Sequence, residues 1–292
     1  MKGVRMKKIL DANLLGIKGE LSELAPLAKV NGFDAIGVPA GLLDNPTAAI
    51  EATKMIESLG LSWGLLPTPT DFFAENVDEN AFEKALETLK RWAALGEEMG
   101  ITRSYNHIWP ASHRPFKENF AWHVERLQKL QQVFQDHGIA YGFEALGPRE
   151  LREMAPHPFV HTLAGVLAIA DAAGGYTGFI FDTFHWYTGS RRPDDLYFAL
   201  QNTHRLVNIH LNDGIAGRTP DEQKDLERAL PMETGVIDSR SIYRLFEKSP
   251  YTGTCVLEPM MPTTTRFAVT PAAAAIAECR AAFDRLESEV AE

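Results

Sequence analysis

The chain has 292 residues, of which 45% are hydrophobic and 23% are charged, a balance typical of globular proteins that excludes wholesale disorder. The formal net charge of −10 disfavours a general electrostatic grip on nucleic acid or on an anionic membrane surface. A small-molecule partner fits this composition better.

The ends and the cysteines indicate where the protein works. Residues 2–8 are basic, but Asp11 and Asn13 interrupt the segment before an apolar signal core can form. No run approaches the roughly 18 apolar residues of a membrane span. Cys255 and Cys279 have no partner at zinc-site spacing, so we expect free, buried thiols. We therefore expect a cytoplasmic protein that binds neither membranes nor nucleic acid.

The first half of the chain alternates strand-like and helix-like segments. Short apolar runs predict strands at residues 8–15, 33–38, 61–66 and 101–106. Apolar residues at helical spacing predict helices at residues 21–31, 46–59, 79–99 and 123–137. A glycine follows each of these helices, as is common at helix ends.

The second half repeats the alternation. It contains predicted strands at residues 140–144, 178–182, 206–210 and 254–258. It contains predicted helices at residues 162–173, 194–202, 242–246 and 270–286. A further helix start is predicted at Thr219, which would cap the chain ahead of Pro220 and two acidic residues.

Eight strands therefore alternate with eight helices, and no linker or composition shift divides them. This alternation predicts a parallel sheet, and eight repeats predict closure into a (β/α)8 TIM barrel, commonly about 250 residues long. We expect an α/β fold in a single domain spanning residues 1–292. An open doubly wound sheet is the alternative, although no phosphate-type glycine motif follows the first strand.

Four successive strands end on residues that can ligate a metal: Glu144, Asp182, His210 and Glu258. In a barrel these positions lie at the C-terminal mouth, where active sites are found. A solitary acid or histidine after a strand is usually a cap or a structural residue, but four on adjacent strands favour one metal site. Three carboxylates and an imidazole suit Mn²⁺, Mg²⁺ or Co²⁺, with Zn²⁺ as an option. Without a cation, at least one carboxylate would take up a proton.

The motifs around these residues carry a family resemblance. They are Phe143-Glu144, Phe181-Asp182-Thr183-Phe184-His185, Ile209-His210-Leu211-Asn212-Asp213 and Leu257-Glu258. In these motifs and their order the chain resembles the xylose-isomerase-like barrel superfamily. That superfamily includes ketose 3-epimerases, hydroxypyruvate isomerase, inosose isomerase and inosose dehydratase, with endonuclease IV as a DNA-directed cousin. The resemblance implies that Glu144, Asp182, His210 and Glu258 hold one divalent metal, and that Glu144 and Glu258 also move protons.

The resemblance also implies substrate contacts. His185 resembles the family's substrate-oxygen contact, and its alternative role is a hydrogen bond to a ligand carboxylate. Arg218 resembles a substrate-binding arginine that follows the histidine ligand, although its spacing is long and a solvated loop arginine is the alternative. Glu150 resembles an acid that holds a terminal hydroxyl, and an exposed acid is the alternative.

Other residues are expected around the pocket. Asn106 and His107 end the fourth strand at the same mouth. Candidate aromatic walls, which alternatively are packed core residues, are Trp186, Trp109 and Phe72. The connection Asn212–Val236 is long enough for a lid, or is a solvated surface loop.

These expectations converge on a divalent-metal-dependent isomerase or epimerase of a small keto-sugar or polyol ketone, working by proton transfer through an enediolate. An inosose-type dehydratase is the alternative on the same site. An endonuclease-IV-like nuclease is disfavoured by the acidic charge and the scattered histidines. Hydride shift by a second metal is disfavoured because only Asp213 is available for it. The sugar, its phosphorylation and the oligomeric state, a dimer or tetramer among the options, stay open.

Overall fold

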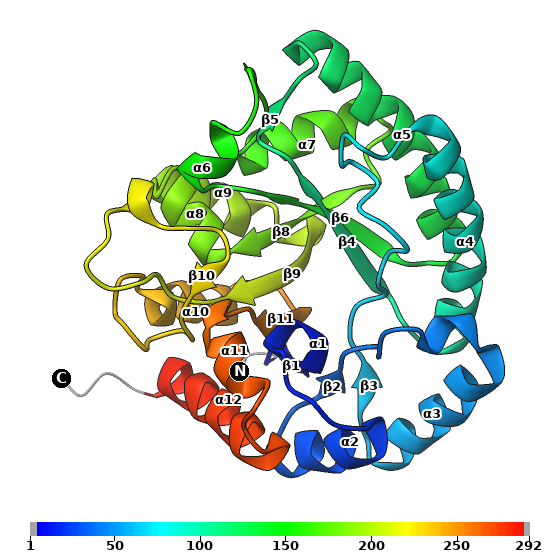
Figure 1. Cartoon of the computed structure of the whole chain (residues 1–292), viewed down its shortest axis with the longest axis vertical. Helices are drawn as coiled ribbons and strands as arrows, with labels where there is room; N and C mark the ends of the chain where they lie inside the picture. The colour runs from blue at the N-terminus through cyan, green and yellow to red at the C-terminus, as the bar shows by residue number, and fades with distance from the viewer. Residues whose placement is uncertain (1–4, 289–292) are drawn as a thin grey trace.

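An eight-stranded parallel sheet, curled into a barrel and ringed by helices, forms the centre of the molecule (Figure 1). The structure is a computed structural model that describes residues 5–288. The two ends of the predicted domain 1–292 lie outside these residues, so its full extent stays a prediction. The predicted α/β TIM barrel is confirmed.

The strands follow one another around the barrel in the order β3-β2-β1-β11-β9-β8-β6-β4. Their bounds are β1 Lys7–Leu10, β2 Ala35–Ile36, β3 Ser62–Trp63, β4 Arg103–Ile108, β6 Ala140–Ala145, β8 Gly178–Asp182, β9 Leu206–Leu211 and β11 Thr254–Leu257. A parallel bridge between Leu66 and Ser104 joins the two ends of this order. Leu66 N–H donates to the Arg103 carbonyl at 2.8 Å, and the Ser104 hydroxyl donates to the Leu66 carbonyl at 2.8 Å. The sheet therefore closes, and the open doubly wound alternative is wrong.

The outer ring consists of amphipathic helices, each buried on the side that faces the sheet. They are α2 Leu21–Val30, α3 Pro46–Ser58, α4 Glu79–Glu98, α5 Phe116–Asp136, α7 Leu163–Ala172, α9 Pro193–Gln201, α10 Ser239–Glu247 and α12 Ala272–Glu287. The side chains of Asn45, Asp78, Thr162 and Asp238 cap four of them by accepting a backbone N–H. Their predicted positions are confirmed, except that α5 begins at Phe116 and not at His123.

Short elements decorate the chain between the barrel strands and the outer helices. They are α1 Ala12–Leu15, α6 Arg149–Arg152, α8 Thr183–Gly189, α11 Thr263–Phe267, the turns η1 Leu42–Asp44, η2 Thr203–Arg205 and η3 Pro220–Glu222, and the small pairs β5 Ala111–Ser112 with β7 His157–Pro158 and β10 Glu227–Arg228 with β12 Met261–Pro262. Most lie in connections that follow a barrel strand and so contribute to the C-terminal mouth.

One local strand prediction is wrong at its C-terminal end. The strand predicted for residues 8–15 ends at Leu10, because Asp11 accepts the Leu14 N–H and starts α1, which Gly16 ends at φ 73°. The helix start predicted at Thr219 is real, with its capping box, but it yields only the single turn η3. A capping box satisfies the first turn of a helix and does not by itself supply the apolar stripe that would extend it.

The barrel wall is aromatic where helices cover it. Phe134 of α5 stacks on Tyr141 of β6 with ring centroids 4.2 Å apart, and Phe181 of β8 packs on Phe246 of α10 at 5.0 Å. Full burial of such a ring is worth about 2–3 kcal/mol.

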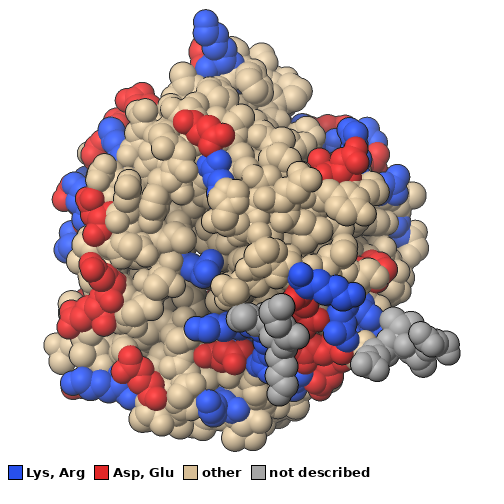
Figure 2. All heavy atoms as spheres, turned by 180° about the vertical axis from the view of Figure 1, so that it is seen from behind, with Lys and Arg blue, Asp and Glu red and all other residues tan. Residues whose placement is uncertain are grey.

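On the face opposite to that of Figure 1, Lys and Arg residues lie interspersed with Asp and Glu residues (Figure 2). Among residues 5–288, no helix has both the length and the apolar character needed to cross a bilayer.

Candidate metal centre

Four adjacent strands bring the predicted ligands together. Glu144 lies near the end of β6, Asp182 ends β8, His210 lies in β9, and Glu258 follows β11. Asp182 and His210 are direct partners in the parallel register, and Glu258 N–H donates to the carbonyl of Leu211 at 2.9 Å. Because side chains alternate along a strand, this register turns all four toward the barrel interior.

The four side chains converge on one point. One ligand atom from each lies within 4.8 Å of the others, and all four residues are buried. His210 Nδ1 lies 2.9 Å from Glu144 Oε1, 3.2 Å from Glu258 Oε1 and 4.0 Å from Asp182 Oδ2. A cluster of three acids around one imidazole is therefore enclosed by protein.

The polar atoms of this cluster fit a cation. Both carboxylate oxygens of Glu144 and both ring nitrogens of His210 are buried, and none makes a hydrogen bond of ordinary geometry with the described residues. Buried polar atoms without partners are costly unless an ion or water satisfies them. Oxygen and imidazole donors are those that Mn²⁺, Mg²⁺, Co²⁺ and Zn²⁺ accept. The residues thus suit one divalent ion.

Without that ion, the acids of the cluster differ in pKa and therefore in protonation. Burial raises the pKa of Asp182 well above its ordinary value, and the nearby Arg228 offsets this only in part. Burial would also raise the pKa of Glu258, but His210 and Arg228 together outweigh it and lower that pKa to about 2. The pKa of His210 itself is raised well above normal, since Glu144 and Glu258 outweigh its burial. One carboxylate of the three thus favours its protonated form, as expected for crowded acids.

A second layer of hydrogen bonds fixes Asp182. Its Oδ1 accepts the His185 N–H at 2.7 Å and so caps α8. Its Oδ2 accepts from Asn212 Nδ2 at 2.8 Å. The Asp-x-x-His spacing of the sequence is therefore also a helix start, which places His185 one turn along, against the same centre. Supporting contacts of this kind orient metal ligands.

Sequence reasoning missed Arg228. This buried residue of β10 extends Nη1 to within 2.5 Å of Glu258 Oε2 and 3.5 Å of Asp182 Oδ2. Its Nη2 donates to Asp225 at 2.8 Å and lies 3.2 Å from His185 Nε2. The signal that could have found it is an arginine within the long connection after β9, but the sequence offers two there, Arg218 and Arg228, and no spacing that selects the second.

Arg218 and Glu150 lie in the surroundings of the centre. Arg218 pairs with Glu227 at 2.5 Å. Glu150 accepts the Asp225 N–H at 2.8 Å and pairs with Lys224 at 3.0 Å. Both side chains make contacts within the connection Asn212–Val236, which contains Arg228. Their predicted substrate contacts remain predictions.

Asn106 and His107 face different surroundings despite being neighbours in β4. His107 Nε2 lies 3.1 Å from Glu144 Oε2 and so turns to the centre. The amide of Asn106 accepts from the Tyr141 hydroxyl at 2.7 Å and donates to Thr68 at 3.1 Å. Both residues line the same cavity, but the amide of Asn106 is already engaged.

The predicted aromatic walls differ from one another. Trp186 of α8 is half-buried and lines a small hollow beside Asp182 and His185, while its Nε1 donates to the Arg192 carbonyl at 3.1 Å. Trp109 donates to Asp71 at 2.6 Å. Phe72 is fully buried and packs edge-on against a helix residue, so it is a core residue and no wall.

One buried acid, Asp213, fixes the conformation of the connection Asn212–Val236. The carboxylate of Asp213 accepts N–H groups of Gly214, Thr234, Gly235 and Ile237 at 2.8–3.0 Å. The carboxylate of Asp213 thus serves the backbone of the loop. The loop bends back over the centre and carries Arg228.

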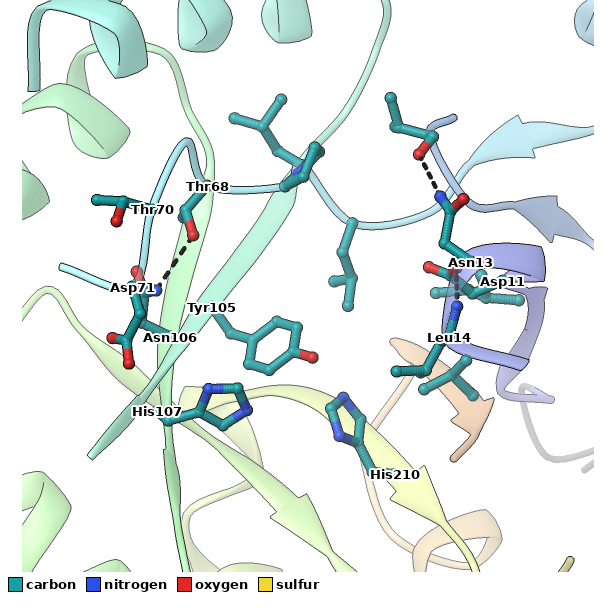
Figure 3. Close-up of a pocket in the computed structure, with 16 residues that line it drawn as sticks. Asp11, Asn13, Leu14, Thr68, Thr70, Asp71, Tyr105, Asn106, His107 and His210 are labelled. Atoms are coloured by element: carbon teal, nitrogen blue, oxygen red, sulfur yellow. Dashed lines mark hydrogen bonds between the residues drawn. The ribbon is translucent and has the colours of Figure 1, made fainter. Parts of the chain in front are cut away.

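A cavity of about 430 Å³ opens beside the centre, toward β1, β3 and β4. Figure 3 shows the rings of Tyr105, His107 and His210 along it, with Asp11 and Asn13 on one side and Thr68 and Asp71 on the other. Its volume is in the range of small-molecule sites.

Comparisons place this chain among known proteins. A family model described as xylose isomerase-like TIM barrel matches residues 25–285. No curated protein matches the sequence. A xylose isomerase domain protein from Alicyclobacillus acidocaldarius subsp. acidocaldarius superposes with a TM-score of 0.81 at 22% identity, covering 97% of this chain and 98% of the other.

Two further structures share the fold at lower identity. The IOLI protein with a bound zinc atom has a TM-score of 0.77 at 16% identity and covers 96% of this chain and 98% of its own. D-psicose 3-epimerase from Clostridium cellulolyticum H10, solved with D-tagatose, has a TM-score of 0.71 at 14% identity over 97% of this chain and 98% of its own. At these identities the likeness concerns the fold.

Proposed function

The chain belongs to the xylose isomerase-like TIM barrel family, and from this premise we propose that it is a metal-dependent isomerase or epimerase of a small keto-sugar or polyol ketone. The observation that carries the proposal is the convergence of four buried ligand atoms within 4.8 Å of one another. A solved relative named as a D-psicose 3-epimerase supports the sugar class. We further propose that it acts in the cytoplasm, where its two buried thiols stay free.

Glu144, Asp182, His210 and Glu258 would hold one divalent ion. We propose Mn²⁺, Mg²⁺ or Co²⁺ because three of the four donors are carboxylates, and the zinc atom named with a relative keeps Zn²⁺ as an alternative. When bound, such an ion polarises a carbonyl and the neighbouring hydroxyl of a substrate and so acidifies the C–H bond between them.

The two glutamates are the proposed proton carriers. Glu144 comes from β6 and Glu258 follows β11, with β8 and β9 between them, so their carboxylates reach the centre from different sides. One glutamate, as the carboxylate, would remove the proton of the acidified C–H bond, and the other, as the carboxylic acid, would return a proton from the opposite face. Return to the same carbon inverts it. Return to the neighbouring carbon, with one proton passing from its hydroxyl to the former carbonyl oxygen, isomerises the sugar.

His185 is the proposed contact for a reacting oxygen, and Arg228 is the neighbour that positions it. Burial lowers the pKa of His185 to about 4, with help from the adjacent Arg228, so its ring is neutral near pH 7. Its Nδ1 accepts the Gly147 N–H at 3.2 Å, which leaves Nε2, 3.2 Å from Arg228 Nη2, as the nitrogen for a substrate oxygen. A polar group fixed in this way can hold an oxygen on which negative charge develops.

The test is solvent exchange. Protein loaded with Mn²⁺ is incubated with keto-sugars and inososes in deuterated buffer, and deuterium uptake and product mass are followed. We expect uptake without loss of water, and loss of uptake in Glu144→Gln and Glu258→Gln. Glu87→Gln, on the exposed face of α4, is the matched control. Exchange retained in both active-site variants would sink the two-glutamate mechanism, and loss of water would identify a dehydratase.

A further inference from the structure

The cavity beside the centre has its own chemistry. It lies outside the cluster of acids, which contributes only His210 among its described lining residues. Apolar side chains such as Ile9, Val38 and Leu65 form part of its wall. Hydroxyl, amide and carboxyl groups form the rest, and they enter from β4 and from the segments that follow β1 and β3 (Figure 3).

The carboxyl groups along this cavity face no free cation. Asp11 and Asp71 line it, none of its described lining residues is Lys or Arg, and its two histidines, His107 and His210, are both turned to Glu144. The nearby guanidinium of Arg228 is already surrounded by Asp182, Asp225 and Glu258. A phosphate or carboxylate on the distal part of a ligand would therefore meet acids and no free cation, which is unfavourable at short range in a partly buried site.

Asp11 is built into the cavity with acceptor capacity to spare. Its Oδ1 accepts the Leu14 N–H at 3.0 Å, which leaves further lone pairs of the carboxyl group for a ligand. Gly37 makes room for it, since a Cβ at that position would lie 2.6 Å from the Asp11 carboxyl carbon. The neighbouring strand is thus shaped around this acid.

Tyr105 supplies the complementary group. Its ring stands edge-on to His210, with centroids 5.0 Å apart, and its hydroxyl points into the open space of the cavity (Figure 3). No hydrogen bond joins this hydroxyl to any described residue, whereas both the oxygen and the nitrogen of the Asn106 amide next to it already have a partner. A phenol donor and a carboxyl acceptor facing one cavity suit a ligand hydroxyl, which both donates and accepts.

We infer that the site takes a substrate that is uncharged beyond its reacting carbons, a free polyhydroxy ketone and not a sugar phosphate or sugar acid, and that Asp11 and Tyr105 hold its distal hydroxyls. The inference rests on the proposed function, whose substrate class it narrows. Neither residue belongs to the metal cluster, so both would affect which substrate is bound and not the binding of the metal.

Two readouts test it. Binding to Mn²⁺-loaded protein is measured by calorimetry for D-fructose, D-tagatose and D-psicose and for the 6-phosphate of each, and deuterium uptake is measured for the same probes. We expect each phosphate to bind about 100-fold more weakly than its parent sugar, a difference that one close like charge suffices to produce. A phosphate that binds as tightly as its parent, or more tightly, overturns the inference.

The two proposals fail differently. Selective binding of the free sugars without deuterium uptake would support the inference and contradict the proposed chemistry. Uptake from the phosphates equal to that from the free sugars would support the chemistry and overturn the inference. If no free sugar binds and none exchanges, both are wrong.

Variants assign the selectivity to named residues. Asp11→Asn keeps the cap of α1, and Tyr105→Phe keeps the ring, so each removes one polar function at constant shape. We expect each to raise KM for the free sugar about tenfold with little change in kcat, as for lost contacts to non-reacting groups. Asp11→Lys should narrow the preference for free sugar over phosphate, and Glu87→Gln should change nothing. Unchanged KM and unchanged preference in all three site variants would overturn the assignment.

Discussion

The Nη1 atom of Arg228 lies 2.5 Å from Oε2 of Glu258, a proposed proton carrier. The buried guanidinium therefore binds one carboxylate oxygen of Glu258, and the other oxygen, Oε1, lies near His210. The same guanidinium reaches Asp225 and His185 through Nη2. One planar side chain thus connects the metal cluster, the loop and the proposed substrate contact. An ammonium group has no such fork.

Arg228→Lys should therefore keep the positive charge but lose the forked set of contacts that the guanidinium makes. We expect kcat/KM for deuterium uptake to fall about 100-fold, equivalent to about 2.7 kcal/mol of transition-state stabilisation. The metal content, measured by atomic spectrometry, should stay near one ion per chain. Arg91→Lys, exposed on α4 far from the centre, is the comparison and should change little. Equal losses in the two variants would contradict the role given to Arg228.

Metal binding should stabilise the fold. The acids repel one another without an ion, so Mn²⁺ at about 100 times its Kd should add about 2.7 kcal/mol to the free energy of unfolding. Chelation should remove this gain, as thermal unfolding would show.

Asp182→Asn refines that measurement. Because burial already favours the neutral form of Asp182, with its pKa raised well above normal, losing the charge should cost the metal-free protein little, and losing the bond from Asn212 should lower the free energy of unfolding by about 1 kcal/mol. The Oδ1 cap of α8 survives in asparagine. The gain on adding Mn²⁺ should shrink. A full gain in the variant would show that Asp182 is no ligand.

His123 should make the protein sensitive to acid. Its ring lies parallel to Phe73 at 5.0 Å, and burial lowers its pKa to about 4. Between pH 6.5 and 4 the unfolded chain binds a proton here that the folded one does not, so stability falls with falling pH and is fully present above pH 6.5. The loss at pH 5 is about 2 kcal/mol. In His123→Phe, urea unfolding at pH 7.5 and pH 5 should differ by about 2 kcal/mol less than in the wild type. An unchanged difference would assign the acid sensitivity elsewhere.

Asp213 should control the loop. Its carboxylate accepts four backbone N–H groups, and an asparagine would turn an amide N–H₂ toward some of them. We expect Asp213→Asn to lower the free energy of unfolding by about 3 kcal/mol. Hydrogen exchange of residues 214–236 should accelerate, and activity should fall with it. Asp221→Asn, exposed in the same connection, should leave the exchange rates unchanged.

Much of this site was predictable because its signals are local. An apolar run that stops on an acid or a histidine needs no tertiary knowledge, and Glu144, Asp182, His210 and Glu258 were all found in this way. Arg228 was not, because its position depends on how a long loop folds back across the barrel. Asp11 was hidden inside a predicted strand that ends one residue earlier. Tyr105 read as a strand residue, since alternation along β4 shows its face only once the register is known.

The four converging ligands occupy one half of the barrel mouth, on β6, β8, β9 and β11, whereas the selective cavity belongs to the half formed by β1, β3 and β4. These halves come from largely separate stretches of the chain. The residues proposed to carry the reaction all lie after residue 139, and nearly all those proposed to choose the ligand lie before it. We therefore expect that exchanging the first 139 residues between relatives would change which ligand is recognised and would leave the proposed reaction machinery in place.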